Sequence, residues 1–233
     1  MAFPPPRPHR QLPTPLATLI LAGISVVVFL YMQTLSETQR IVGNVRVDDL
    51  NLFFYRFSLI PERLFGTSPY PNLDAIPATL TLLTSMFLHG GLTHIVINMI
   101  AFVSFGIMLE RRIGWPRFTL IYFAAGIAGG LVQALLTGDP KTPVVGASAA
   151  IMGIIGATFL HFPKMRILLL IVPMPLWIAL VVLVVSHLAF IVFDWDAGIA
   201  WWAHLGGLAA GLLIEWPFAR SIQRRPPNRG PWE

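Results

Sequence analysis

The feature that most constrains this chain is a series of six stretches, each about as long as a membrane-spanning helix, that are almost free of charge. They occupy residues 16–35, 91–109, 118–136, 144–162, 175–193 and 199–219. Across all six, Glu215 is the only acidic or basic residue. A soluble helical core needs polar helix faces for its exterior, whereas these stretches are apolar all round. The sequence therefore predicts an all-α membrane protein with six transmembrane helices.

Composition agrees with a bilayer environment. Hydrophobic residues make up 55% of the 233 residues and charged residues 12%, about half the charged share of a soluble domain. The chain has no cysteine, which excludes disulfides and thiol chemistry. The formal net charge is +5, but the basic residues gather at the ends of the apolar stretches. We interpret them as topology signals and expect lipid, not nucleic acid, as a partner.

The distribution of positive charge predicts the orientation. Most lysines and arginines fall on the side that holds both termini and the second and fourth connections, which places both termini in the cytoplasm. We expect residues 1–15 to be a short cytoplasmic tail, 16–219 a six-helix domain, and 220–233 a basic, disordered cytoplasmic tail. The first apolar stretch lacks an evident small-residue cleavage site and is expected to be an anchor. A bacterial inner membrane is the simplest location.

The longest connection, residues 36–90, is placed outside the membrane by this topology. It contains the aromatic residues Phe53, Phe54, Tyr55 and Phe57 among mixed charges. Aromatic clusters favour the membrane interface, so two interpretations stay open. The segment is either an ordinary extracytoplasmic loop or an element that lies partly in the headgroup region.

Four polar side chains inside the apolar stretches require a reason, because polar groups are costly in a membrane. They are His94, Asn98, Ser148 and His204. Each lies near the start of a stretch that runs from outside to inside, so all four have a similar depth. This matched depth predicts a shallow cavity, open to extracytoplasmic water, between the helices.

Small residues indicate which helices pack closely. Gly207 and Gly211 share a helix face with His204, at spacings of three and seven residues. The stretch 144–162 is itself rich in glycine and alanine. Close packing between these two helices would bring Ser148 to His204.

Taken together, these motifs resemble the rhomboid family of intramembrane serine proteases. The likeness extends from about Thr81 to Gly211. It includes the segment 84–91, His94-x-x-x-Asn98-Met99, Glu110-x-x-Ile113-Gly114, Gly146-Ala147-Ser148 and the segment 204–211. The resemblance implies a six-helix rhomboid-like bundle that cuts transmembrane segments of other membrane proteins near the outer leaflet, without a cofactor or metal.

The resemblance also implies roles for the polar residues. Ser148 would be the nucleophile and His204 the base of a dyad without a carboxylate, while His94 and Asn98 would donate hydrogen bonds to the oxyanion. An imidazole activates a serine hydroxyl by accepting its proton and later protonates the leaving amine.

Backbone N–H groups are also expected to stabilise the oxyanion. Gly146 and Ala147 would line the oxyanion or substrate site, where unpaired N–H groups at the start of the helix, including those of Ala147 or Ser148, face developing negative charge.

Other candidates for catalysis are weaker. Glu215 follows His204 by eleven residues, about 16 Å along a helix, so it cannot orient that imidazole. Asp194 and Asp196 are interpreted as acids of an interfacial loop. Zinc is not expected, because the sequence contains no His-Glu-x-x-His motif.

The remaining histidines are not expected to take part in catalysis, and the sequence departs from the family pattern at two positions near Ser148. His89 is expected to support the turn before the second stretch, and His161 and His187 are expected to have no catalytic role. Ala149 stands where glycine commonly follows the serine, and Met152 stands where an aromatic residue often supports the histidine. These two substitutions affect the expected rate and substrate preference. The Trp-Arg pair that the family carries in its first long loop is missing from residues 36–90.

Two other functions are alternatives to proteolysis. The first is a non-catalytic rhomboid-like membrane protein that binds and routes other membrane proteins; the presence of both Ser148 and His204 argues against it. The second is a transporter or channel, which would be expected to show charged relays or repeated halves. The sequence shows neither.

Overall fold

The computed structural model describes residues 13–35, 39–42, 45–66, 68, 70–169, 171–193, 195 and 198–223. Most of the two tails expected at residues 1–15 and 220–233 therefore lies outside the described residues. Asp194 and Asp196, considered above as acids, also lie outside them.

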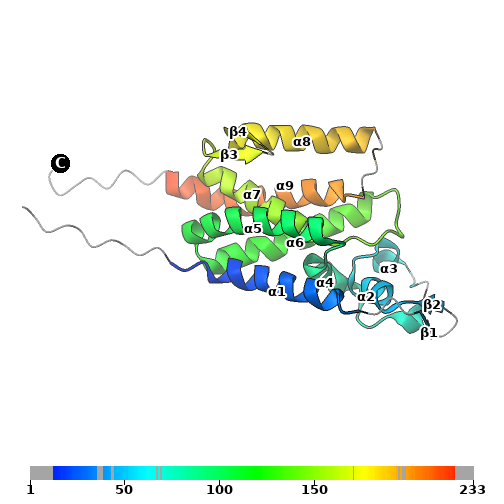
Figure 1. Ribbon diagram of the computed structural model, residues 1–233. Helices are drawn as coiled ribbons and strands as arrows, with labels where there is room; N and C mark the ends of the chain where they lie inside the picture. Colours follow the sequence, from blue (N-terminus) through cyan, green and yellow to red (C-terminus); the bar gives the residue numbers. More distant parts are fainter. Residues whose placement is uncertain are drawn as a thin grey trace, which may run out of the picture.

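Six long helices form the bundle (Figure 1). They are α1 (Leu16–Met32), α5 (Leu92–Ile113), α6 (Trp115–Leu136), α7 (Ser148–His161), α8 (Leu176–Val192) and α9 (Trp201–Gln223). Each coincides with one of the six predicted stretches, which confirms the all-α bundle. By length and composition alone, α5 and α6 are able to cross a membrane, while α1, α7 and α8 are shorter apolar helices.

Large apolar side chains face outward along several of these helices. Val27 of α1, Ile97 of α5 and Val185 of α8 each expose 60% or more of their surface. Contiguous apolar exposure of this kind is unusual on a soluble monomer and suits contact with lipid. The polar exterior that a soluble bundle would need is missing from these faces.

α7 is the central helix, and it is shorter than expected. It packs on α5, α6 and α9, and all ten of its residues from Ala149 to Thr158 are buried. The predicted stretch began at Val144, but residues 144–147 are not helical. Val144 pairs with Leu59 in an isolated β-bridge, and Gly146 has a φ of +116°, which an α-helix does not allow. These two features delay the helix until Ser148.

The long connection 36–90 is folded rather than an irregular loop. It contains the hairpin of β1 (Arg40–Val42) and β2 (Val45–Val47), then α2 (Asp49–Phe57), α3 (Pro61–Phe65), η1 (Pro71–Leu73), η2 (Ala78–Leu80), α4 (Thr81–Thr84) and η3 (Ser85–Phe87). Figure 1 shows these elements gathered at one end of the bundle. The Asp48 side chain caps α2 by accepting from the Asn51 N–H at 2.7 Å.

Arg63 organises this folded connection. Its guanidinium is 2.8 Å from the Asp74 carboxylate, lies 4.7 Å from the Tyr55 ring centroid and donates to the Tyr55 carbonyl. Phe53 contacts Phe57 and also Tyr31 of α1, with ring centroids 4.7 and 5.6 Å apart. Part of the aromatic cluster therefore packs inside the protein and ties the connection to α1.

Two buried carboxylates join helices elsewhere in the bundle. Glu110 of α5 accepts from the Thr18 N–H at 2.8 Å and from the Ala17 N–H at 3.0 Å, which satisfies free donors at the start of α1. Glu215 of α9 is fully buried and contacts Arg117 of α6 at 3.1 Å and His161 of α7 at 2.8 Å. Both acids therefore act in helix packing.

α8 lies at the edge of the bundle. It follows a short hairpin of β3 (Arg166–Leu169) and β4 (Val172–Pro175), and it packs mainly on α9 and on that hairpin. Figure 1 shows α8 beside α9, on the opposite side of the bundle from α1. An apolar groove between α8 and the pair α7 and α9 is lined by residues such as Phe159, Val184 and Leu212.

Candidate active site

Ser148 is the first residue of α7, and the chain before it is shaped by Gly146. The positive φ of Gly146 disfavours any other residue, and a Cβ there would lie 2.8 Å from His94 Nε2. The Gly146 N–H donates to the Ser85 carbonyl at 2.9 Å, which anchors the segment to η3. The serine is therefore presented at the end of a fixed turn, beside His94.

Ser148 and His204 meet between α7 and α9. The Oγ of Ser148 lies 2.8 Å from the Nε2 of His204, which is hydrogen-bond distance. The two helices approach so closely that a Cβ on Gly207 would overlap the Ala149 carbonyl, and a Cβ on Gly211 would overlap the Gly153 carbonyl. The close packing expected from the small residues is therefore present and brings the two side chains together.

His94 and Asn98 occupy different surroundings. The His94 ring lies against Gly146, and its Nδ1 accepts from the Gly90 N–H at 3.4 Å. The Asn98 amide instead bonds back to its own helix, since Nδ2 donates to the His94 carbonyl at 2.9 Å. Asn98 is buried, and its Oδ1 has no hydrogen-bond partner among the described residues. His94 thus lies next to the turn that carries Ser148, with Asn98 one helical turn behind it.

Backbone N–H groups at the start of α7 are further hydrogen-bond donors next to Ser148. N–H groups in the first turn of a helix have no partner within it, and in α7 that turn begins at Ser148. Ala147 is fully buried directly before it. The Gly146 N–H, by contrast, is already occupied by Ser85, so Gly146 contributes backbone shape.

His187 of α8 also belongs to the site, although the sequence alone predicts no catalytic role for it. Its Nε2 lies 2.9 Å from the Nδ1 of His204, on the side of the ring opposite Ser148. His187 is 5% exposed. The expected depth of His187 in the membrane could have identified it. In the predicted topology this helix runs from inside to outside, and His187 lies six residues before Phe193, where the predicted stretch ends, so it has a depth similar to that of His204.

Two aromatic rings lie close to His204. Met152, where an aromatic support is common in the family, belongs to the buried apolar core. The rings that contact His204 are His187 and Trp201, with centroids 5.0 and 6.1 Å away. Aromatic support therefore comes from α8 and from the start of α9.

The other histidines hold structural positions. His89, in the turn before α5, is 1% exposed; its Nδ1 is 3.3 Å from the Phe87 carbonyl, and its ring is edge-on to His94 at 5.1 Å. Burial, and then the nearby His94, lowers the pKa of His89 to about 4. His161 bonds to Glu215, far along α9 from His204.

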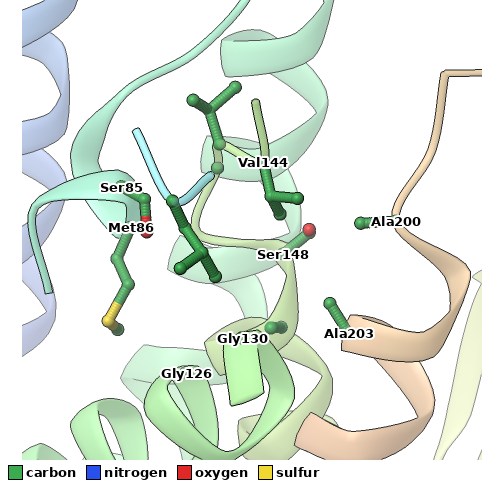
Figure 2. Close-up of a pocket in the computed structure, with 12 residues that line it drawn as sticks. Ser85, Met86, Gly126, Gly130, Val144, Ser148, Ala200 and Ala203 are labelled. Atoms are coloured by element: carbon green, nitrogen blue, oxygen red, sulfur yellow. The ribbon is translucent and has the colours of Figure 1, made fainter. Parts of the chain in front are cut away.

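A small pocket lies beside the serine (Figure 2). Its walls are mostly small or apolar: Leu59, Ser85, Met86, Gly126, Gly130, Val144, Val145, Gly146, Ala149, Ala200 and Ala203, together with Ser148 itself. Figure 2 shows the Ser148 hydroxyl directed into the space between Val144 and Ala200. Glycine and alanine at these positions leave room next to the hydroxyl for a small group.

The fold and this geometry define a membrane-embedded helical bundle with a serine and a histidine paired between two helices. The chain matches the Rhomboid domain over residues 78–221, more than half of its length. It belongs to the rhomboid family.

Three relatives illustrate the range of that family. The chain is 33% identical to RHOMBOID-like protein 6, mitochondrial, of Arabidopsis thaliana, over 84% of this chain and 66% of the relative. It is 43% identical to Rhomboid protease GluP of Bacillus subtilis, over 33% of this chain and 14% of the relative. It is 35% identical to Inactive rhomboid protein 1 of Drosophila melanogaster, over 40% of this chain and 6% of the relative.

The chain spans about half to two thirds of the length of the curated relatives that it matches over the longest stretches. Some of these are named as mitochondrial proteins. Family membership therefore places the protein in a membrane.

Proposed function

We propose that the protein is a serine endopeptidase that cleaves transmembrane segments of other membrane proteins. The observation that carries this proposal is the 2.8 Å separation between Ser148 Oγ and His204 Nε2. In the proposed reaction, His204 accepts the hydroxyl proton while Oγ attacks the scissile carbonyl. The imidazolium then protonates the leaving amine, and water activated by the same imidazole hydrolyses the acyl-enzyme.

The oxyanion would be stabilised by His94 and by the free backbone N–H groups at the start of α7, near Ala147 and Ser148. Donors held at fixed positions in a medium of low dielectric stabilise developing charge more than donors in water do. Asn98 would join them through the second proton of Nδ2, because its first is directed to the His94 carbonyl. Gly146 would keep the turn open so that His94 reaches the reacting carbonyl.

The pocket beside Ser148 would receive the side chain that precedes the cut. Gly126, Gly130 and Ala203 leave space for a small side chain, and Met86 limits that space. A bulky residue would clash with this wall and hold the scissile carbonyl away from Oγ. Substrates with a small residue before the cut are therefore favoured.

The substrate would reach the site from the lipid. A transmembrane segment would enter laterally between α8 and α5, because α8 packs mainly on α9 and on the hairpin that precedes it. Because α5, α7 and α9 begin on the predicted outer side, cleavage would occur near the outer leaflet. We further propose that both termini face the cytoplasm and that the protein resides in a bacterial inner membrane, in keeping with the distribution of basic residues.

The second candidate function is a non-catalytic rhomboid-like protein that binds and routes membrane proteins. One relative is named as inactive, so membership in the family does not by itself establish catalysis. The hydrogen-bonded pair of Ser148 and His204 favours the enzyme, because a binding protein has no need for a base aligned on a serine hydroxyl.

The test compares the purified wild-type protein with Ser148→Ala and His204→Ala in detergent, using a transmembrane reporter substrate. Ser104→Ala, an exposed serine of α5, is the matched control. We expect cleavage by the wild type and the control and none by the other two variants. A fluorophosphonate probe should label the same two active proteins. Equal cleavage by all four proteins contradicts the proposed pair, and a wild type that neither cleaves nor labels supports the binding protein.

A further inference from the structure

The contact between His187 and His204 carries an inference that rests on the proposed function and deepens it. We propose that His187 is a positioning residue that holds His204 in the tautomer able to accept the serine proton. The observation is a continuous line of three side chains from three helices: Ser148 on α7, His204 on α9 and His187 on α8. The two separations along it are 2.8 and 2.9 Å.

The two hydrogen bonds fix the protons on the rings. A base that accepts from the serine must have a free lone pair on His204 Nε2, so the neutral ring carries its hydrogen on Nδ1. That Nδ1–H then donates to Nε2 of His187, which must be unprotonated. His187 therefore carries its own hydrogen on Nδ1. The alternative tautomer of His204 would direct an N–H at the serine oxygen and could not remove its proton.

His187 itself is held firmly in place. Its ring lies edge-on to Trp201, with centroids 4.8 Å apart and an interplanar angle of 78°. Trp201 in turn stacks on Phe190 at 4.5 Å, with the two rings nearly parallel. This aromatic group joins α8 to α9 next to His204, so the acceptor cannot turn away without loss of packing.

A neutral acceptor suits this location. In serine hydrolases with a triad, a carboxylate bonds to the far nitrogen of the histidine and fixes its tautomer. A buried, unpaired carboxylate is expensive in a medium of low dielectric, whereas a neutral imidazole provides an acceptor without that cost. The titratable side chains near His204 in the described part of the chain are His187 and His94, and neither is an acid.

The proposal adds no proton transfer to the reaction. The serine proton moves to His204 Nε2 as Oγ bonds to the carbonyl carbon, and it later leaves with the amine. Throughout, the Nδ1 hydrogen of His204 stays on that ring and continues to donate to His187. The contribution of His187 is to orient His204 and to stabilise the imidazolium as it forms.

Two substitutions separate this role from packing. His187→Phe retains a ring against Trp201 but removes the acceptor, and His187→Gln restores an acceptor on a side chain of similar reach. We expect His187→Phe to lower kcat and the fluorophosphonate labelling rate by about 10- to 100-fold, the effect of one hydrogen bond to a charged group, with KM little changed. His187→Gln should recover most of that loss. Equal rates for His187→Phe and the wild type overturn the proposal.

A spectroscopic measurement tests the tautomer without any need for activity. In protein with ¹⁵N-labelled histidine, the His204 signals are assigned by their disappearance in His204→Ala. We expect a protonated Nδ1 and an unprotonated Nε2 in the wild type and in His187→Gln, with a mixture of tautomers in His187→Phe. A wild-type His204 protonated on Nε2 overturns the positioning role, even if His187→Phe fails to fold.

The two experiments also distinguish failure of this role from failure of the proposed function. If the wild type does not label, the protease proposal fails, while the tautomer measurement still decides whether His187 orients His204. If the wild type labels and His187→Phe labels equally fast, the protease proposal stands and the positioning role alone is wrong.

Discussion

Gly207 of α9 packs directly on the backbone carbonyl of Ala149, the residue that follows Ser148 in α7. A Cβ at position 207 would overlap that carbonyl, so the separation of the two helices is set by backbone contact. His204 lies one turn before Gly207 on the same face of α9. The spacing that permits this packing is therefore also the spacing that brings His204 Nε2 to within 2.8 Å of Ser148 Oγ.

The first prediction concerns this contact. A Gly→Ala change inside a helix normally favours the helix by about 0.5–1 kcal/mol. Gly207→Ala should do the opposite, because the methyl group forces α7 and α9 apart, lowers the midpoint of thermal unfolding and slows fluorophosphonate labelling at least about 10-fold, as one lost hydrogen bond would. Gly23→Ala in α1 is the control, since a Cβ there meets no atom within 4 Å. Wild-type labelling by Gly207→Ala would show that α9 shifts without disturbing the pair.

The second prediction concerns Asn98. Loss of one oxyanion donor costs about 10²–10³ in turnover in a known serine hydrolase. If the proposed function holds, Asn98→Ala should therefore weaken cleavage by up to that factor, whereas Ser148→Ala should abolish it. Asn98→Asp retains the shape of the side chain but replaces the donor by an acceptor, and it should be impaired at least as strongly. Initial rates with a reporter substrate measure both. Unchanged kcat in both variants would limit Asn98 to its hydrogen bond with the His94 carbonyl.

The six-helix bundle could be predicted from sequence because uncharged stretches of this length have few alternatives to spanning a membrane. The residues at which helices begin and end were harder to predict from the sequence. The start of α7 was placed four residues early, because the β-bridge between Val144 and Leu59 joins segments that are far apart in the chain. The small elements within residues 36–90 were also missed. They depend on tertiary contacts, such as that of Arg63 with Asp74, and not on a periodic pattern.

Some residues of the candidate site could be predicted from the sequence and others could not, again because some contacts depend on the tertiary structure. The pairing of Ser148 with His204 could be predicted from their similar expected depth and from the small residues near them. Both features can be recognised within the sequence of a single helix. His187 was overlooked, because its value depends on how α8 is placed against α9. A lone histidine in an apolar helix says little until its partner is known. In the predicted topology, His187 lies near the outer end of its helix, at a depth similar to that of His204.

The third prediction concerns Glu215, whose buried carboxylate contacts Arg117 and His161. The Arg117 side chain is 30% exposed, so water can solvate its charge when the carboxylate is removed, whereas the buried His161 ring loses its partner. A buried group left without its hydrogen-bond partner costs about 1–3 kcal/mol, so Glu215→Ala should lower the midpoint of thermal unfolding. Glu62→Ala is the control, since Glu62 lies in the short helix α3 and is only partly buried.

The same variant separates stability from catalysis. Glu215 follows His204 by eleven residues, about 16 Å along α9. The fraction of Glu215→Ala that stays folded at low temperature should therefore label with fluorophosphonate at the wild-type rate. Slower labelling of the folded fraction would mean that the contact of Glu215 with His161 influences the distant pair through α7.

The last prediction is a pH dependence of stability that arises from His89. Burial lowers the pKa of this imidazole to about 4 in the folded protein, whereas its ordinary value is 6.5. Between these two values the unfolded chain binds more protons than the folded one, so the free energy of unfolding falls as the pH drops from 6.5 to 4. Above pH 6.5 this contribution is constant. His89→Gln, which cannot be protonated in this range, should lose less stability than the wild type between pH 7 and pH 5, measured as the shift in Tm in one detergent. Parallel Tm profiles for the two proteins would show that His89 accepts a proton without cost in the folded state.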